Sequence, residues 1–130
     1  MVRLGVAAAL LTVGALWWHP AEEVRTIEID IEHSSFHPEQ IEVEAGETVR
    51  FVIHNGDPID HEFLVGDEVM QQIHEEGTEA HHGAKPGEVS IAAFHDAETT
   101  FEFDEPGTLI FGCHLPRHYN FGMRGEIVIE

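Results

Sequence analysis

The stretch GCHLPRHYNFGM, residues 112–123, decides how the rest of the sequence is interpreted. It places a thiol at Cys113, an imidazole at His118 and a thioether at Met123, each five residues after the last. Such a loop can wrap around one ion after a strand that ends at the cysteine, and it then presents two sulfur ligands and one nitrogen ligand. These soft ligand types favour copper, so the stretch predicts a copper-binding loop.

A trigonal copper site with a thiolate, two imidazoles and a weak axial thioether requires a second histidine from elsewhere in the chain. The best candidate is His61, which opens a hydrophobic run and shares the inward face of a regular strand with Phe63 and Val65. Cys113 points inward in the same way at the end of its own strand. Two such residues can meet at one end of a sandwich, where the loop after Cys113 supplies the other two ligands.

Hydrophobic residues alternate with polar ones in most of the chain after residue 26. The alternation occurs in these groups: Ile27, Ile29 and Ile31; Ile41 and Val43; Val49, Phe51 and Ile53; Phe63 and Val65; Phe101 and Phe103; Leu109 and Phe111; Ile127 and Ile129. This period of two is typical of strands with one buried face, and turn residues separate the groups. The pattern predicts an all-β chain of short antiparallel strands in a sandwich or barrel.

The stretch from Asp67 to Gly87 departs from this alternation. Its first residue is a suitable helix N-cap, Val69, Met70 and Ile73 share one helical face, and Gly77 is placed to end the helix. We interpret the stretch as a crossover insertion with a short helix. It also contains residues that could bind a second, exchangeable divalent ion, namely His74, His81 and His82 with Glu75, Glu76 and Glu79.

Two stretches together resemble the cupredoxin family of type 1, or blue, copper proteins. They are residues 112–123 and the segment FHPEQIEVEAGETVRF, residues 36–51, which is similar to the family's early strand, turn and strand. The spacing of the cysteine, histidine and methionine is most similar to that in rusticyanins and auracyanins. The likeness covers about residues 26–130.

The resemblance implies a cupredoxin-like Greek-key β-sandwich of eight strands, to which this chain adds its short helical insertion. It also implies one type 1 copper ion with three equatorial ligands and one axial ligand, namely His61, Cys113 and His118 in the plane and Met123 on the axis. The sequence departs from the family at two positions. Glu62 follows the first histidine where a small polar residue often ties the ligand loops together, and Arg117 replaces a usual glycine.

The resemblance further implies a one-electron carrier and not an enzyme, because no substrate bond is broken at such a site. Multicopper oxidases need additional His-x-His pairs and binuclear copper centres need a second cysteine, and the sequence has neither. We therefore assign a structural role to His114, directly after the cysteine. Copper binding for tolerance or delivery stays open as a second function, since the insertion histidines and His114 would serve it.

The sequence has 25 acidic and 6 basic residues, with a formal net charge of -19. This balance argues against nucleic acids and anionic lipids as partners, because both require a cationic surface. A redox partner such as a basic cytochrome or a membrane oxidoreductase fits this charge better. A simpler interpretation is that the acidity only keeps the surface solvated. The length suits one domain, and we expect a monomer.

The first residues have the order of an export signal. Arg3 precedes a hydrophobic run from Leu4 to Trp18, but no clear cleavage site follows. The two tryptophans that end the run suit a membrane interface, so an N-terminal anchor is the alternative. We predict a signal peptide or membrane anchor at residues 1–21 and a cupredoxin (plastocyanin-like) domain at residues 22–130. The location is then outside the cytoplasm, in a periplasm or at the cell surface.

Overall fold

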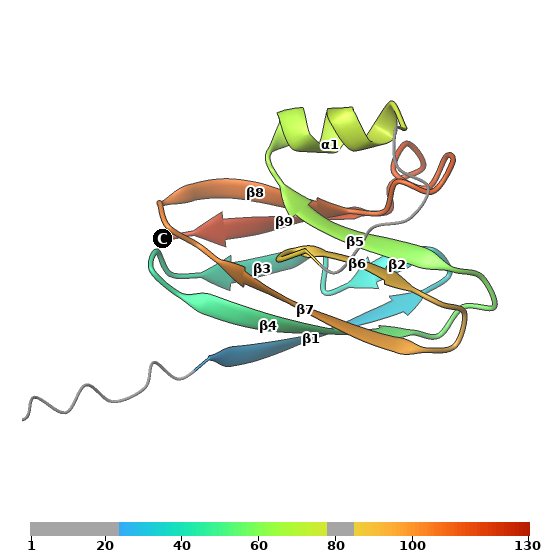
Figure 1. The fold of residues 1–130 in the computed structure, drawn as a ribbon, viewed down its shortest axis with the longest axis horizontal. Helices are drawn as coiled ribbons and strands as arrows, with labels where there is room; N and C mark the ends of the chain where they lie inside the picture. The colour runs from blue at the N-terminus through green and yellow to red at the C-terminus, as the bar shows by residue number, and fades with distance from the viewer. Residues whose placement is uncertain (1–23, 78–84) are drawn as a thin grey trace, which may run out of the picture.

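The computed structural model describes residues 24–77 and 85–130. Within these ranges nine strands form two packed sheets and one helix lies against one of them (Figure 1). The elements are β1 (Arg25–Glu32), β2 (Ser35–His37), β3 (Gln40–Val43), β4 (Thr48–Asn55), β5 (His61–Gly66), α1 (Glu68–Glu75), β6 (Glu88–Ile91), β7 (Asp96–Glu102), β8 (Gly107–Gly112) and β9 (Arg124–Ile129). The predicted signal or anchor at residues 1–21 lies outside the described residues. The described part of the chain contains no helix with the length and hydrophobicity to span a membrane.

The two sheets confirm the predicted all-β sandwich with a short helix. One sheet has the strand order β2-β1-β4-β7 and the other has the order β3-β9-β8-β5-β6. The expectation of antiparallel strands throughout is wrong, because β1 pairs with β4 in parallel and β3 pairs with β9 in parallel. Between the two strands of each parallel pair the chain crosses to the other sheet and back. The second strand of the pair therefore runs in the same direction as the first. The described ranges hold nine strands and not the eight implied by the resemblance, and the shortest, β2, has three residues.

A group of aromatic side chains fills the space between the sheets. Its five fully buried members are Phe36, Phe51, Phe63, Phe103 and Phe111. The ring centroid of Phe111 lies 5.3 Å from that of Phe36 and 5.4 Å from that of Phe63, and Phe51 lies 5.2 Å from Phe63. Each such pair contributes about 0.5–1.5 kcal/mol beyond the burial of its area. Most inward residues of the alternating pattern are thus core residues, as predicted, whereas Ile27, Phe101 and Leu109 are only partly buried.

Helix α1 begins where the sequence predicts it. The Asp67 side chain accepts a hydrogen bond of 2.8 Å from a backbone N–H of the first turn, which caps the helix. The apolar face of the helix does not pack on the core, however, since Val69 and Ile73 are 65% and 51% exposed. The buried helix residue is Gln71, at 1% exposure. The helix therefore contacts the sheet through an amide group, which hydrophobic periodicity does not reveal.

Gln71 connects α1 to two strands. Its side-chain nitrogen donates to the carbonyl of Leu64 in β5 at 3.2 Å and to that of Ile110 in β8 at 2.9 Å. We expect Gln71→Ala to lower the free energy of unfolding by about 1–3 kcal/mol, because two carbonyl groups lose a buried donor. Urea denaturation of the metal-free protein measures this change. The matched control is Gln72→Ala, because Gln72 is an exposed neighbour whose side chain donates, among the described residues, only to Glu76 at the end of the helix. A similar loss in both variants would contradict the bracing role of Gln71.

Candidate metal centre

The site lies where two adjacent strands of the five-stranded sheet meet a loop. His61 is the first residue of β5, and Cys113 directly follows β8, its antiparallel neighbour. Both side chains continue the inward faces of their strands, two residues from Phe63 and Phe111 respectively. The aromatic core therefore fixes the direction in which the histidine and the cysteine point.

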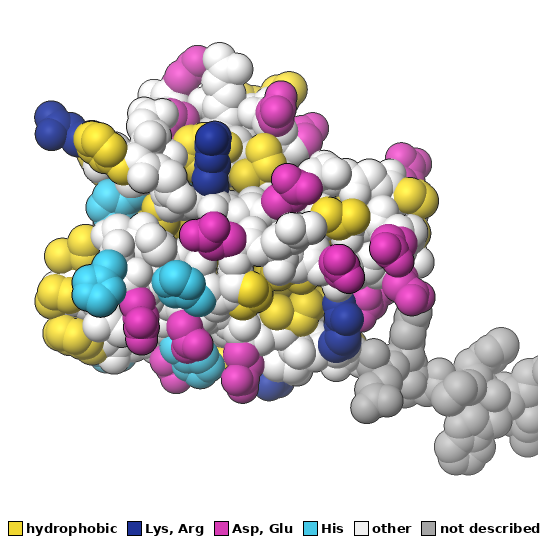
Figure 2. Space-filling view, turned by 180° about the vertical axis from the view of Figure 1, so that it is seen from behind, with side chains coloured by type: hydrophobic (Ala, Val, Ile, Leu, Met, Phe, Trp, Pro, Cys, Tyr) yellow, Lys and Arg dark blue, Asp and Glu magenta, His cyan; other side chains and the backbone are white. Residues whose placement is uncertain are grey.

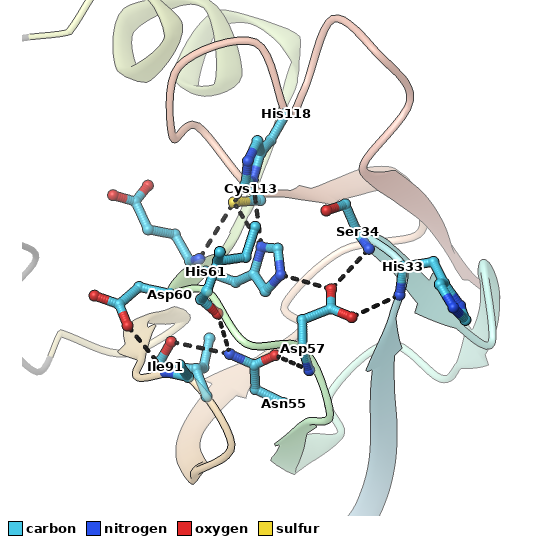
Figure 3. A network of polar contacts seen from close by, with 12 residues as sticks. His33, Ser34, Asn55, Asp57, Asp60, His61, Ile91, Cys113 and His118 are labelled. Atoms are coloured by element: carbon cyan, nitrogen blue, oxygen red, sulfur yellow. Dashed lines mark hydrogen bonds and ion pairs between the residues drawn. The ribbon is translucent and has the colours of Figure 1, made fainter.

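The side chains of His61, Cys113 and His118 face one another at this end of the sandwich (Figure 3). The two Nδ1 atoms lie 3.3 Å apart, and the Cys113 sulfur lies 3.4 Å from Nδ1 of His118 and 3.9 Å from Nδ1 of His61. In residues 24–77 and 85–130 this is the only group of three or more His, Cys, Asp or Glu residues whose ligand atoms all lie within 4.8 Å of one another.

The spacing of these three atoms fits a transition-metal ion. A point equidistant from them lies about 2 Å from each, close to the lengths of roughly 2.0–2.3 Å for bonds from nitrogen and sulfur ligands to zinc, a first-row metal. Two imidazoles and one thiolate in a plane are the equatorial set of a blue copper centre. The arrangement is that of a type 1 copper site.

Met123 returns to the same place at the end of the loop. Its side chain is 1% exposed and belongs to the same buried cluster as Cys113. The backbone N–H of Cys113 donates to the carbonyl of Met123 at 3.1 Å, and the N–H of Met123 donates to the carbonyl of His118 at 3.0 Å. These hydrogen bonds bring Met123 back to Cys113 and His118, so all four residues expected as ligands lie together.

Burial sets the proton affinities of two of these groups. It raises the pKa of the Cys113 thiol to about 11, although hydrogen bonds from the backbone of Glu62 and Leu115 act in the opposite direction. Burial and the neighbouring His61 ring lower the pKa of His118. Binding of a metal must therefore displace a proton from the thiol, whereas His118 is a neutral imidazole at neutral pH.

The two departures from the family pattern have structural consequences. The backbone N–H of Glu62 donates to the Cys113 sulfur at 3.3 Å. This backbone hydrogen bond connects the two ligand segments, a connection that the Glu62 side chain was not expected to make. Arg117 has a φ of 75°, in the left-handed region that favours glycine. The loop thus keeps a glycine-like backbone at Arg117, at a cost of roughly 1–2 kcal/mol for a residue with a side chain.

Asp57 is a site residue that the sequence interpretation missed. Its carboxylate is buried, and it accepts hydrogen bonds of 2.7 Å from the backbone N–H groups of His33 and Ser34 (Figure 3). Nε2 of His61 lies 2.9 Å from the same carboxylate. Burial alone would raise the pKa of Asp57, but the hydrogen bonds from Ser34, His61 and His33 lower it. The turn composition around Asp57 already explained an aspartate there, so no sequence signal pointed to the site.

His114 points to helix α1, in agreement with its predicted structural role. Its Nδ1 lies 2.7 Å from a carboxylate oxygen of Glu75, and its Nε2 lies 2.6 Å from the amide oxygen of Gln71. The ring also stacks on Tyr119, with centroids 4.5 Å apart. A Cβ atom at Gly112 would lie 2.7 Å from that tyrosine ring, so the glycine before the ligand is needed for this packing. The insertion helix and the copper loop are joined here.

The second metal site predicted in the insertion is only partly within the described residues. His81 and His82 lie outside them, together with Glu79. His74 lies inside, with Nε2 2.8 Å from a carboxylate oxygen of Glu88 and Nδ1 3.0 Å from the carbonyl of Met70. Both ring nitrogens of His74 therefore face oxygen atoms of the protein, and the second metal site stays a prediction.

The sequence matches known copper proteins over most of its length. The family model described as a cupredoxin-like domain matches residues 5–129. The copper-resistant cuproprotein CopI of Rubrivivax gelatinosus is 35% identical, over 85% of this chain and 69% of that protein. The protein of the same name from Pseudomonas aeruginosa is 30% identical, over 85% of this chain and 78% of that protein.

Solved structures give the same result for the fold. The auracyanin of the photosynthetic bacterium Roseiflexus castenholzii superposes with a TM-score of 0.68, at 23% identity, over 81% of this chain and 96% of that one. Auracyanin A, a blue copper protein of Chloroflexus aurantiacus, superposes with a TM-score of 0.67, at 23% identity, over 83% of this chain and 100% of that one. The family match, the relatives and the fold agree with the resemblance found in the sequence, and the chain belongs to the cupredoxin family.

Proposed function

We propose that this protein binds one type 1 copper ion through His61, Cys113, His118 and Met123 and carries single electrons outside the cytoplasm. The observation that supports this most strongly is that three ligand atoms converge around one point, two of them from the buried residues His61 and Cys113, at 1% and 0% exposure. Ligands that the fold already holds in place need little rearrangement when the charge of the ion changes. When bound, copper supplies the one-electron Cu(II)/Cu(I) couple.

The residues of the chain have separate parts in this function. The Cys113 thiolate, the Nδ1 atoms of His61 and His118 and the thioether of Met123 would hold the ion, and the thioether would adjust its reduction potential. His118 is partly exposed, whereas the other three are buried, so its ring gives an electron the shortest path to the surface. No substrate bond is broken, and the protein is not an enzyme. The export signal predicted at residues 1–21 supports a location outside the cytoplasm.

Exposed hydrophobic side chains on the loops near the site support brief docking of a redox partner. Ile59, Phe94 and Phe121 are 45%, 69% and 84% exposed, and we call them the apolar rim. Ile59 lies two residues before His61, in the loop that precedes β5, and Phe121 lies in the loop that carries His118. The backbone N–H of Phe94 donates to the carbonyl of Asp57 at 3.1 Å, which joins its loop to that of Ile59. Exposed hydrophobic side chains are a common feature of protein interaction sites.

The charge of the remaining surface indicates the chemistry of that partner. Figure 2 shows many acidic and few basic side chains on one face of the molecule. The whole sequence carries a formal net charge of -19. Such a field accelerates association with a positively charged protein and disfavours an acidic one. We therefore propose a basic cytochrome or a membrane oxidoreductase with a basic docking face.

Electron exchange with a basic c-type cytochrome tests this function. We expect stopped-flow absorbance to show rapid exchange with the copper-loaded protein, at a rate that falls as ionic strength rises. Phe121→Ser should slow the exchange by about tenfold, because truncation of an aromatic anchor at an interface typically costs more than about 1 kcal/mol. The control is Val69→Ser, a similarly exposed position on α1, which should leave the rate unchanged. Absence of exchange in the unaltered protein, or equal slowing by both variants, would reject the proposal.

A second candidate function is copper binding for tolerance or delivery. The names of both relatives support it, since each is called a copper-resistant cuproprotein. Transfer of Cu(I) to a competing chelator separates the two functions. Slow transfer with rapid electron exchange supports the electron carrier, and rapid transfer with slow exchange supports tolerance or delivery.

A further inference from the structure

We infer that Asp57 is a charged positioning residue, which fixes the ligand face of His61 and favours Cu(II) over Cu(I) at the site. The inference rests on the proposed function in one respect only, that His61 is a copper ligand. Asp57 does not touch the ion in this assignment and acts through the histidine. Its carboxylate lies on the far side of the His61 ring from the Cys113 sulfur (Figure 3).

The first step concerns which ring nitrogen of His61 faces the metal. Asp57 already accepts two backbone hydrogen bonds, as an ionised carboxylate does, so the contact at 2.9 Å requires an N–H on Nε2 of His61. In a neutral imidazole, Nδ1 then carries the free electron pair. Nδ1 is the atom that lies among the other ligand atoms, 3.3 Å from Nδ1 of His118. A carboxylate on the outer nitrogen of a ligating histidine is a recurrent way to fix its tautomer and ring orientation.

The second step concerns why this carboxylate is charged. His33 and Ser34 have φ values of 53° and 56°, both in the left-handed region, and their successive N–H groups point at the two oxygens of Asp57. Successive backbone N–H groups in such a turn form a concave site for an anion. The turn between β1 and β2 therefore adopts an unfavourable backbone conformation that an ionised Asp57 stabilises.

The third step concerns how firmly Asp57 is held. Its own backbone N–H donates to the side chain of Asn55 at 3.0 Å. Asn55 in turn donates to the carbonyls of Ile59 at 2.8 Å and Ala92 at 3.0 Å. These bonds tie the Asp57 loop to the loop that follows β6. A carboxylate fixed on this scaffold cannot move away from His61 when the charge at the site changes, so its negative charge acts on both oxidation states from one position.

A fixed negative charge next to a ligand stabilises the more positive ion. Asp57 should therefore strengthen Cu(II) binding more than Cu(I) binding and lower the reduction potential. Loss of an outer contact to a metal ligand typically costs about 10- to 100-fold in affinity. If the loss falls on Cu(II), a tenfold change in the ratio of the two affinities corresponds to about 59 mV for one electron.

The variant Asp57→Asn tests the inference, with Asp60→Asn as the matched control. Asp60 lies in the same loop and is exposed, and its side chain accepts a hydrogen bond from the backbone of Ala93 without contacting a ligand. Redox titration of the copper-loaded proteins should show a rise of about 59 mV or more for Asp57→Asn, with the thiolate-to-copper band retained, and a much smaller rise for Asp60→Asn. Equal potentials in the two variants would overturn the inference.

Two further measurements keep the test decisive. Nitrogen-15 NMR of the metal-free, unaltered protein should show His61 as the Nε2–H tautomer, and the opposite tautomer would overturn the inference even where Asp57→Asn fails to fold. The rate of electron exchange in the unaltered protein tests the proposed function separately. Slow exchange together with a shifted potential would reject the electron carrier and keep the role of Asp57, whereas rapid exchange without a shift would reject only that role.

Discussion

The Cys113→Ser variant is expected to lose the strong thiolate-to-copper absorption band completely. The band requires a sulfur-to-metal bond, and Cys113 is the only cysteine in the sequence. The loss of Cu(II) affinity should exceed roughly 100-fold, the upper range for replacement of an outer contact, because a direct ligand is removed. The visible spectrum after addition of one equivalent of Cu(II), and its bleaching by a reductant, measure the effect.

His114→Ala is the control for this variant. His114 is adjacent to Cys113, but its ring nitrogens lie 2.7 Å from Glu75 and 2.6 Å from Gln71 and do not belong to the ligand cluster. The variant should therefore keep the band while it weakens the contact between α1 and the copper loop. Loss of the band in both variants would show that the ligand assignment is wrong.

The sequence predicted the sandwich because burial alternates strictly on most of its strands. The eight residues of β4 show this best, since Val49, Phe51 and Ile53 are fully buried between more exposed neighbours. Strand β5 shows the limit of this signal, because His61 to Val65 are all buried. One face of β5 packs on the core, and α1 lies over the other face. Burial therefore no longer follows the alternation in this strand.

The placement of the four expected ligands at one end of the sandwich could be predicted because it depends on residue type and on spacing along the chain. The loop from Cys113 to Met123 is local, and its backbone hydrogen bonds need no information from distant residues. Only His61 required an assumption about which segments lie close together in space. The inward direction of its side chain at the start of β5 was enough to select it. The direct environment of the site is therefore encoded in short segments.

The outer contacts of the site could not be predicted in this way. Asp57 meets the N–H groups of His33 and Ser34 across more than 20 positions of the sequence, in two turns whose composition is ordinary. In the sequence, Gln71 is likewise indistinguishable from any polar residue of a surface helix, yet it is buried and contacts two strands. Contacts of this kind depend on how the sheets place their loops, and no local pattern reports that placement. The parallel pairings were missed for the same reason.

The metal-free protein is expected to lose about 2–3 kcal/mol of stability through Cys113 alone as the pH rises from about 8 to about 11. Burial raises the pKa of this thiol from 9.0 to about 11 in the folded protein. A group that binds its proton more tightly when folded adds stability that is fully present below the unfolded pKa. That stability is lost as the pH rises through the folded pKa. The folded and unfolded pKa values differ by about 2, which corresponds to a loss of about 2–3 kcal/mol.

Few other groups interfere with this measurement, because Lys85 and Tyr119 are the only lysine and the only tyrosine in the sequence. Urea denaturation with a chelator present, at pH 8 and at pH 11, gives the change in the free energy of unfolding. In the Cys113→Ala variant the same pH step should cost about 2–3 kcal/mol less, since no thiol remains to ionise. An identical pH dependence in both proteins would mean that the thiolate is tolerated in the buried site without a metal. Copper binding would then not have to stabilise the thiolate against burial.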